Sequence, residues 1–516
     1  MLPVIDLFAG PGGLSEGFGA FRAGRKRVFR IALSIEKDPA ARDTLRLRSF
    51  FRQFPSGAPD AYYDFLRGSV DLHELYRRYP DEAARANEEA WLAELGKPEK
   101  YPIAAIDERI AKSLDGAEDW VLIGGPPCQA YSVVGRSRMA QDRKKCEKDD
   151  RHFLYREYLR IIAIHRPPVF VMENVKGILS TKVEGSLIID RILSDLKRPC
   201  EAIGETGSAR LKKNVDYELY PFASYGTSRS LFRELDPDPS GYVIRTERHG
   251  IPQARHRLIL LGIRSDLNVE PTMLPVSDQD VPMWRVIRDL PRLRSALSRG
   301  EDSPEDWVMT VRQVGDLKFM RDDGMDADIW HLLRKTIRRV KPSLTTGGEF
   351  VPSPKVPVWQ YAWFYDPRLG GVCNHATRAH MPSDLWRYFF AACFARVRKK
   401  SPLLTEFPAC LLPEHKNAKN WDDGEDLAFE DRFRVQVKHR PSTTITAHMS
   451  KDGHYFIHPD PIQCRSLTVR EAARLQTFPD NYFFVGPRTE QYKQVGNAVP
   501  PLIARKLAKV VYHLLK

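Results

Sequence analysis

The sequence predicts an α/β fold built on a doubly wound, Rossmann-like parallel sheet. Four short apolar runs end in turn-forming or acidic residues, as strands covered on both faces do: 3–10, 30–38, 120–128 and 169–175. Between them, apolar residues recur at helical spacing, most clearly over 12–24 and 153–166. This alternation of strand and helix predicts neighbouring parallel strands with helices packed against the sheet.

A change of pattern then divides the chain. Residues 241–250 and 255–263 are typical of a hairpin, which would add antiparallel strands to the sheet. Beyond it the alternation is lost, and seven of the nine tryptophans lie within 265–464, which indicates a module with its own core. Helical periodicity then returns. We expect a first domain over 1–264 with a mostly helical insertion at about 50–105, a separate mixed domain over 265–464, and a segment over 465–516 that completes the first domain.

The composition favours a globular protein with an anionic partner. Hydrophobic residues make up 42% of the chain and charged residues 28%, and the net charge is +13. This excess of positive charge fits nucleic acid or an anionic membrane surface. No apolar stretch approaches the roughly 18 residues of a membrane span, and no basic leader precedes the first strand. We therefore expect a cytoplasmic, nucleoid-associated protein.

Cysteine and histidine spacing argues against a metal site. The seven cysteines are odd in number, far apart and never form a CxxC pair, so neither a disulfide framework nor a zinc site is expected. His249 and His256 have no ligand-like spacing and are expected to be ordinary hydrogen-bonding or surface residues.

Ligands of an open α/β sheet bind outside the carboxyl ends of its strands. The first strand ends in the loop FAGPGG (residues 8–13), and Glu36 ends the second. Ser15 stands where a dinucleotide-binding loop has its third glycine, so the loop suits a nucleoside cofactor without a pyrophosphate, such as S-adenosylmethionine. Glu36 would accept hydrogen bonds from its ribose hydroxyls. A tight turn without a ligand is the alternative for the loop alone.

Two reactive side chains follow the later strands. Cys128 comes after two glycines and two prolines, which stiffen the backbone and leave space, so the thiol would be presented to a ligand as a nucleophilic thiolate. A buried, inert thiol is the alternative. Glu173 closes the next apolar strand, where a carboxyl is costly unless it is paired or used. It is predicted to be a proton-donating acid near Cys128, with helix capping as the alternative.

Two arginines begin the last strand of the first domain. Arg255 and Arg257 precede the apolar run that ends near Ile263. If this strand is antiparallel to the others, its start lies at the edge where they end. The two guanidinium groups would then face Cys128 and Glu173.

Seven segments in this order resemble the DNA (cytosine-5) methyltransferases. They correspond to the family's cofactor loop, nucleophile, following helix, acid, arginine pair, late structural helix and closing segment, and read DLFAGPGGLSEGF, GGPPCQAYS, DDRHFLYREYLRII, ENV, QARHR, SLTVREAARLQTFPD and QVGNAVPPLIARKLA. The resemblance covers about half the chain, residues 1–38, 120–180, 245–263 and 465–510.

The resemblance implies an S-adenosylmethionine-dependent methyltransferase fold and a role for each catalytic residue. Cys128 would attack carbon 6 of cytosine, Glu173 would hold the base and help to protonate it, and Arg257, with Arg255 alongside, would contact its carbonyl oxygen. The cofactor pocket is expected to include Phe8, Gly10, Gly12, Gly13, Leu14, Glu36, Pro127, Leu154, Asn497 and Ala498. We add Asp107 as the acid near the adenine amine.

The basic segment after Cys128 predicts a loop that clamps DNA phosphates, with a merely solvated loop as the alternative. Contacts with DNA are expected from Gln129, Ser132, Arg136, Arg138 and Arg151. By resemblance, the domain over 265–464 is the target-recognition domain, although no short code relates its sequence to the bases it reads. We expect a monomer that acts on double-stranded DNA. A cognate restriction nuclease, a phage-defence system and a solitary enzyme all stay open.

Two other functions compete with DNA methylation. One branch of the fold methylates cytosine in RNA, but its members are compact and lack a long recognition module. The second alternative is a non-catalytic DNA-binding protein on the same scaffold, which the intact set of Cys128, Glu173 and Arg257 argues against.

Overall fold

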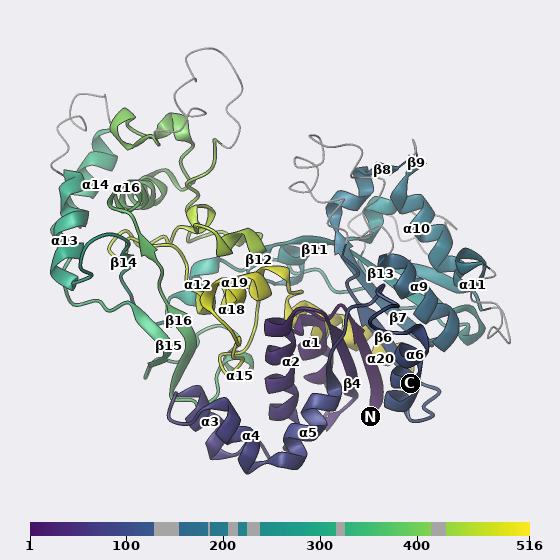
Figure 1. The fold of residues 1–516 in the computed structure, drawn as a ribbon. Helices are drawn as coiled ribbons and strands as arrows, with labels where there is room; N and C mark the ends of the chain where they lie inside the picture. Colours follow the sequence, from purple (N-terminus) through teal and green to yellow (C-terminus); the bar gives the residue numbers. More distant parts are fainter. Residues whose placement is uncertain (128–153, 184–185, 205–214, 224–237, 316–325, 414–429) are drawn as a thin grey trace. The chain divides into compact units, whose positions relative to one another are not determined.

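The computed structural model describes residues 1–127, 154–183, 186–204, 215–223, 238–315, 326–413 and 430–516. The chain divides into two compact units. Unit 1 comprises 1–58, 76–279 and 498–516, and unit 2 comprises 59–75 and 280–497. Each unit therefore combines segments that are distant in the sequence (Figure 1).

Unit 1 is organised around one mixed sheet. Its strands are β1 (Leu2–Leu7), β4 (Phe29–Glu36), β5 (Ala90–Leu92), β6 (Val121–Gly124), β7 (Val169–Val175), β10 (Tyr217–Pro221), β11 (Val243–Arg245) and β13 (His256–Arg264). They lie in the order β10-β13-β7-β6-β1-β4-β5, and β11 also pairs with β13. The run from β7 to β5 is parallel, whereas β13 is antiparallel to β7, β10 and β11. The predicted doubly wound α/β fold and the antiparallel hairpin strand are confirmed.

Helices pack on both faces of this sheet (Figure 1). They are α1 (Gly13–Gly19), α2 (Pro39–Arg52), α5 (Pro80–Glu89), α6 (Ile103–Leu114), α9 (Leu154–His165), α10 (Ile188–Lys197), α11 (Pro199–Ile203) and α20 (Pro501–Leu514). Ile5 and Leu7 of β1 join a buried cluster with Ile106 of α6 and Leu159 of α9. The intervening Asp6 faces the other way, toward Ser15 of α1. Successive side chains of a strand point to opposite faces, so β1 is covered on both.

Two elements differ from the expected ones. The helix expected over 12–24 ends at Gly19, and the chain then forms a small ribbon of β2 (Arg22–Ala23) and β3 (Lys26–Arg27). Gly24 between them has a φ of 61°, which a helix would not allow. The segment over 50–105, expected to be mostly helical, also contains β5, which pairs in parallel with β4.

Unit 2 has its own core and includes part of the early insertion. Its elements are α3 (Asp60–Leu66), α12 (Met283–Ile287), β14 (Ala296–Leu297), α13 (Pro304–Arg312), α14 (Ala327–Ile337), β15 (Gly347–Pro352), α15 (Tyr361–Phe364), β16 (Gly371–Ala376), β17 (Ala379–His380), α16 (Pro382–Arg398), β18 (Ser442–Thr443), α18 (Val469–Leu475) and α19 (Arg488–Asn497), while α4 (Leu72–Arg78) spans the boundary with unit 1. Trp307, Leu333 and Phe389 bring α13, α14 and α16 into one buried cluster. The Tyr63 hydroxyl of α3 donates to Asp366 Oδ2 at 2.7 Å, which ties α3 to the later segments.

The boundary near the C-terminus falls inside the last expected segment. Residues 465–497 lie in the compact unit that holds 280–464, whereas 498–516 lie with β1. Among the described residues, the helices are all too short or too polar to cross a membrane.

Candidate active site

The glycine-rich loop after β1 is shaped by its backbone. Gly12, the N-cap of α1, has a φ of 88°, which favours glycine. A Cβ atom at Gly13 would lie 2.1 Å from the Val499 carbonyl oxygen, so only glycine lets α1 approach the C-terminal segment this closely. The Ala9 N–H donates to the Ile35 carbonyl at 3.1 Å, which holds the loop against the end of β4.

Glu36 fixes the same loop from the end of β4. Its Oε2 accepts the Gly10 N–H at 2.7 Å, and its Oε1 accepts the N–H groups of Lys37 and Asp38 at 2.9 and 2.8 Å. Burial raises the pKa of Glu36 above its usual value, although these three N–H groups oppose the shift. The carboxylate and the loop, predicted separately from the sequence, therefore lie together.

Asp6 is a second acid beneath this loop that the sequence analysis did not single out. The Ser15 hydroxyl donates to Asp6 Oδ2. Burial raises the pKa of Asp6 to about 7, while the bond from Ser15 opposes the shift. The sequence did mark Asp6, because it is a single acid inside the apolar run of β1. It lies before the end of the strand, however, and ligands are expected beyond that end.

The segment that leads to Cys128 runs beside Glu173. The Gly125 N–H donates to the Leu7 carbonyl at 3.4 Å, and a Cβ atom at Gly125 would lie 3.0 Å from Glu173 Oε2. The Asn174 side-chain amide donates to the Pro126 carbonyl at 3.4 Å. Pro127 is half-buried. Cys128 itself, and the expected DNA contacts Gln129, Ser132, Arg136, Arg138 and Arg151, lie outside the described residues.

Glu173 and Arg257 form an ion pair at the edge of the sheet. In the antiparallel pairing of β7 with β13, Glu173 lies opposite Ile259 and Arg257 lies opposite Val175. Both charged side chains are therefore on one face, two pairing positions apart. Arg257 Nε lies 3.0 Å from Glu173 Oε1, and each side chain is only 14% exposed. The expectation that an antiparallel strand brings these residues to one edge is met.

Arg255 lies deeper than Arg257. Its N–H donates to the Gln253 carbonyl and to Thr246 Oγ1 at 3.0 and 3.2 Å. Burial lowers the pKa of Arg255 well below its usual value, the neighbouring Arg257 lowers it further, and Glu173 raises it. Glu173 thus acts electrostatically on two guanidinium groups.

Asp107 lies on α6 rather than at the end of a strand. Its Oδ1 accepts Arg160 Nη1 at 2.8 Å and lies 3.1 Å from His165 Nε2, both on α9. Burial alone would raise the pKa of Asp107, but His165 and Arg160 hold it below its usual value. The geometry shows a carboxylate that fastens α6 to α9.

Glu94 is an acid that the sequence analysis missed. It follows β5, whose neighbour β4 ends in Glu36, and the Ala93 N–H donates to the Glu36 carbonyl at 3.0 Å. Glu94 Oε1 lies 3.4 Å from Lys37 Nζ. A three-residue strand within a charged, helical segment gives almost no periodic signal, which explains why Glu94 was overlooked.

Leu154 borders a pocket of about 230 Å³ in unit 1. Gly96, Tyr101 and Ile106 line it with Leu154, so the pocket lies just beyond β5 and beside the start of α9. Its walls are of mixed polarity, because two charged side chains of α9 line it beside the apolar ones, and its place after β5 suits a planar ring with polar edges.

The two remaining cofactor candidates fall on either side of the boundary near the C-terminus. Ala498 is buried in unit 1, next to Val499, which contacts the α1 glycine. Asn497 is the exposed last residue of α19 in unit 2. Phe8 and Gly10 are partly buried in the loop, and Leu14 is buried on α1.

Comparison with known proteins identifies the family. The chain matches the family described as C-5 cytosine-specific DNA methylase over residues 95–199 and 230–513. It is 33% identical over 530 residues to the type II methyltransferase M.Bpa9945I of Bacillus paralicheniformis, with 98% of each chain covered. It is 24% identical over 427 residues to the DNA (cytosine-5-)-methyltransferase M.ApeKI of Aeropyrum pernix, with 78% of this chain and 83% of that protein covered. The chain therefore belongs to the C-5 cytosine-specific DNA methylases and is a DNA (cytosine-5-)-methyltransferase.

Proposed function

We propose that the protein flips a cytosine out of double-stranded DNA and methylates its carbon 5 through a covalent Cys128 adduct, with S-adenosylmethionine as the methyl donor. The observation that carries this proposal is the Glu173–Arg257 pair, 3.0 Å apart, beside Gly125. The glycine lies three residues before Cys128 in the sequence, which supports the proposal that the thiol acts beside this carboxyl and guanidinium.

The residues after β1, β4 and β5 fit the proposed cofactor. Each oxygen of a carboxylate can accept more than one hydrogen bond, so Glu36 can bind ribose hydroxyls while it holds the loop. The pocket bordered by Leu154 would take the adenine ring, and Glu94, which follows the strand next to Glu36, fits the acid near the adenine amine better than Asp107 does. When bound, S-adenosylmethionine supplies an electrophilic methyl group on a sulfonium.

Cys128 would begin the chemistry. Its thiolate adds to carbon 6 of the cytosine while Glu173 donates a proton to the ring nitrogen, so an electron pair becomes available at carbon 5. Carbon 5 takes the methyl group. Loss of the carbon 5 proton to a base then expels the thiolate and restores Cys128, while the ring nitrogen returns its proton to Glu173. Arg257, oriented by Glu173, would donate to the carbonyl oxygen of the base throughout, with Arg255 beside it.

A cytosine within a duplex must leave the base stack to reach Cys128, at a cost of about a few kcal/mol. We propose that the basic segment after Cys128 offsets part of this cost by clamping phosphates through Arg136, Arg138 and Arg151, with Gln129 and Ser132 near the flipped base.

We also propose that residues 265–464 read the DNA sequence and that 465–516 complete the catalytic domain. A separate buried core around Trp307 supports a distinct reading module. Residues 498–516 lie in the same compact unit as β1 and α1, which supports the second assignment for that part of the segment. A cognate restriction nuclease is the proposed partner, because M.Bpa9945I is a type II methyltransferase.

The test of the function is covalent trapping. DNA that carries 5-fluorocytosine at the methylated position should form a denaturation-resistant adduct with the wild type, because fluorine cannot leave as a proton does. Cys128→Ala should form none and should transfer no methyl groups, whereas the control Cys410→Ala, which replaces an exposed thiol in unit 2, should retain both activities. Bisulfite sequencing of DNA and RNA from expressing cells identifies the substrate. An adduct with Cys128→Ala, or methylation confined to RNA, would contradict the proposal.

A further inference from the structure

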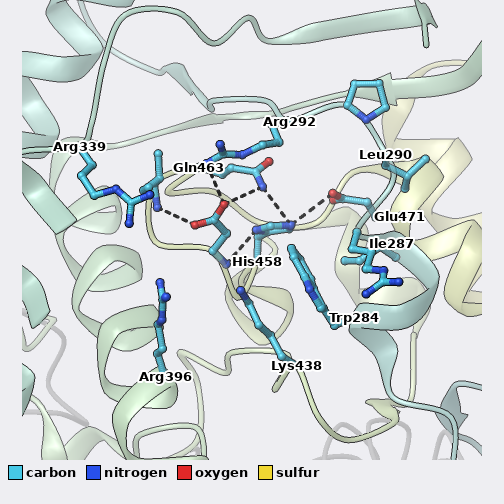
Figure 2. Close-up of a pocket in the computed structure, with 14 residues that line it drawn as sticks. Trp284, Ile287, Leu290, Arg292, Arg339, Arg396, Lys438, His458, Gln463 and Glu471 are labelled. Carbon is cyan, nitrogen blue, oxygen red and sulfur yellow. Dashed lines mark hydrogen bonds and ion pairs between the residues drawn. The ribbon is translucent and has the colours of Figure 1, made fainter. Parts of the chain in front are cut away.

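Unit 2 contains a pocket of about 280 Å³ whose rim is strongly basic. Its walls come from separate parts of the unit: α12, the chain after α14, the end of α16, and the loops around Lys438 and His458. Figure 2 shows the side chains of Arg339, Arg396 and Lys438 directed toward the space beside His458. We call this site the basic pocket.

The two acids of the basic pocket have partners of their own. Asp460 Oδ2 lies 3.0 Å from Arg292 Nη2, and Asp460 Oδ1 accepts the Ile462 N–H at 3.3 Å. Glu471 accepts both Nη1 and Nη2 of Arg465 at 2.7 Å. The ion pairs of these two acids are therefore with Arg292 and Arg465, and not with the other cations of the pocket.

His458 adds no charge. Burial and the neighbouring Arg465 lower its pKa to about 3, although Glu471 and Asp460 oppose the shift. Its Nδ1 accepts the Asp460 N–H at 3.1 Å, so the proton of the neutral ring is on Nε2. The ring thus acts as a rigid wall, packed at 6.0 Å against Trp284.

Four cations of the lining remain to bind a ligand: Arg288, Arg339, Arg396 and Lys438. The guanidinium groups of Arg339 and Arg396 are exposed and make neither a hydrogen bond nor an ion pair with any other described residue. Lys438 Nζ lies 4.1 Å from the centre of the Trp284 ring. Burial lowers the pKa of Lys438, Asp460 raises it, and the fields of Arg396 and Arg292 lower it further. The cations therefore repel one another, and an anion between them would relieve that repulsion.

The pocket is also held in place by its backbone. The Trp284 N–H donates to the Lys438 carbonyl at 3.3 Å, and the Met283 N–H donates to the Arg440 carbonyl at 2.8 Å. The loop that carries Lys438 is thereby fastened to α12. Two guanidinium forks and one ammonium on a fixed frame match the oxygens of a phosphate group.

We propose that the basic pocket binds a backbone phosphate of the DNA through Arg339, Arg396 and Lys438. This inference rests on the proposed function, which brings unit 2 to the duplex. Exposed cations at the mouth of an open pocket suit a phosphate presented by a polymer better than a small molecule that must be enclosed. Such a contact positions the duplex and carries no base information.

The test compares the salt dependence of DNA binding in the absence of cofactor. Arg339→Gln and Arg396→Gln should each reduce the slope of log Kd against log salt by about 0.9, on duplexes with and without the methylated sequence alike. Arg338→Gln is the matched control, because Arg338 is an exposed neighbour of Arg339 that does not line the pocket. Its slope should equal that of the wild type.

Three outcomes decide the proposal. Lower slopes for both pocket variants, with the control unchanged, support it, whereas slopes equal to that of the control overturn it. A loss of inorganic phosphate binding, measured by calorimetry, without any change in the DNA slopes would assign the pocket to a free phosphate ligand and also overturn it. Because the assay needs no methyl transfer, lower slopes in a protein that methylates no DNA would sink the proposed function and leave the pocket assignment standing.

Discussion

Charge removal at the edge of the sheet should affect stability asymmetrically. Glu173→Gln leaves two positive charges, Arg257 and Arg255, without the carboxylate that offsets their repulsion. Arg257→Gln instead leaves Glu173 with Arg255 as a neighbour of opposite charge. Loss of one partner from a buried ion pair costs about 3–5 kcal/mol. We expect Glu173→Gln to destabilise unit 1 by about the lower of these values, since each side chain keeps 14% exposure.

Arg257→Gln should reduce the stability of unit 1 by less than Glu173→Gln does. Arg257→Gln should cost about 1–2 kcal/mol, as expected when a polar group keeps a poorer partner. The double variant should recover about 1–3 kcal/mol relative to the sum of the single ones, because the two side chains are in direct contact. This recovery is the coupling energy of the pair.

Native-state hydrogen exchange of the β7 and β13 amides measures these losses, because it reports the local stability of unit 1. The amides of β15 and β16 in unit 2 serve as the internal control. A larger loss for Arg257→Gln than for Glu173→Gln would refute the reasoning, since it would show that Arg255 does not share the carboxylate.

Single-turnover methylation tests the same pair chemically. Glu173→Gln and Arg257→Ala should each slow transfer by roughly 100-fold to 1000-fold while DNA binding is retained. A rate within about threefold of the wild type, against this expectation, would mean that the acid is misassigned.

Two further predictions concern the loop after β1. Gly13→Ala should abolish cofactor binding, measured by calorimetry, because its Cβ would lie 2.1 Å from the Val499 oxygen. The control Gly19→Ala, whose Cβ would have its nearest neighbours at 3.7 Å, should bind the cofactor normally. Equal cofactor affinities of the two variants would contradict the packing argument. Burial raises the pKa of Asp6 from 3.8 to about 7, so the folded state holds the Asp6 proton more tightly than the unfolded state does. As pH rises from 3.8 to about 7, the wild type should therefore lose stability relative to Asp6→Asn. The loss should be up to about 1.4 kcal/mol per pH unit. Denaturation of both proteins from pH 4 to pH 8 checks this, and parallel profiles would show that Asp6 titrates normally despite its burial.

The strands that carry chemistry could be predicted from the sequence because their ends are marked. A buried run that stops at Glu36 or Glu173 identifies both a strand and a polar edge, and the structure joins each to the partners expected there. Asp6 and Glu94 escaped for physical reasons. Asp6 points sideways from the middle of β1 toward α1, and Glu94 follows a strand too short to show a period.

The basic pocket lay beyond sequence reasoning altogether. Trp284, Arg339 and Arg396 come from three segments without a shared motif, and exposed arginines are usually solvated. Only tertiary packing brings them to one cavity. Asp107 shows that sequence distance can also mislead. Its spacing before Cys128 suggested a contact with the adenine amine, but its carboxylate is paired with Arg160 on α9.

The contact between α1 and α20 has a consequence for the order of synthesis. A Cβ atom at Gly17 would lie 2.4 Å from that of Ala504, and the rings of Phe21 and Tyr512 lie 5.6 Å apart. The ribosome therefore makes α1 long before α20, and the apolar face of α1 is covered only after α20 has been made. During translation, unit 2 is complete before unit 1, so a nascent chain can fold its second unit while the cofactor loop is still open. A chain that stops before Pro501 would lack this cover and should be recognised by chaperones or proteases rather than released as a competent enzyme.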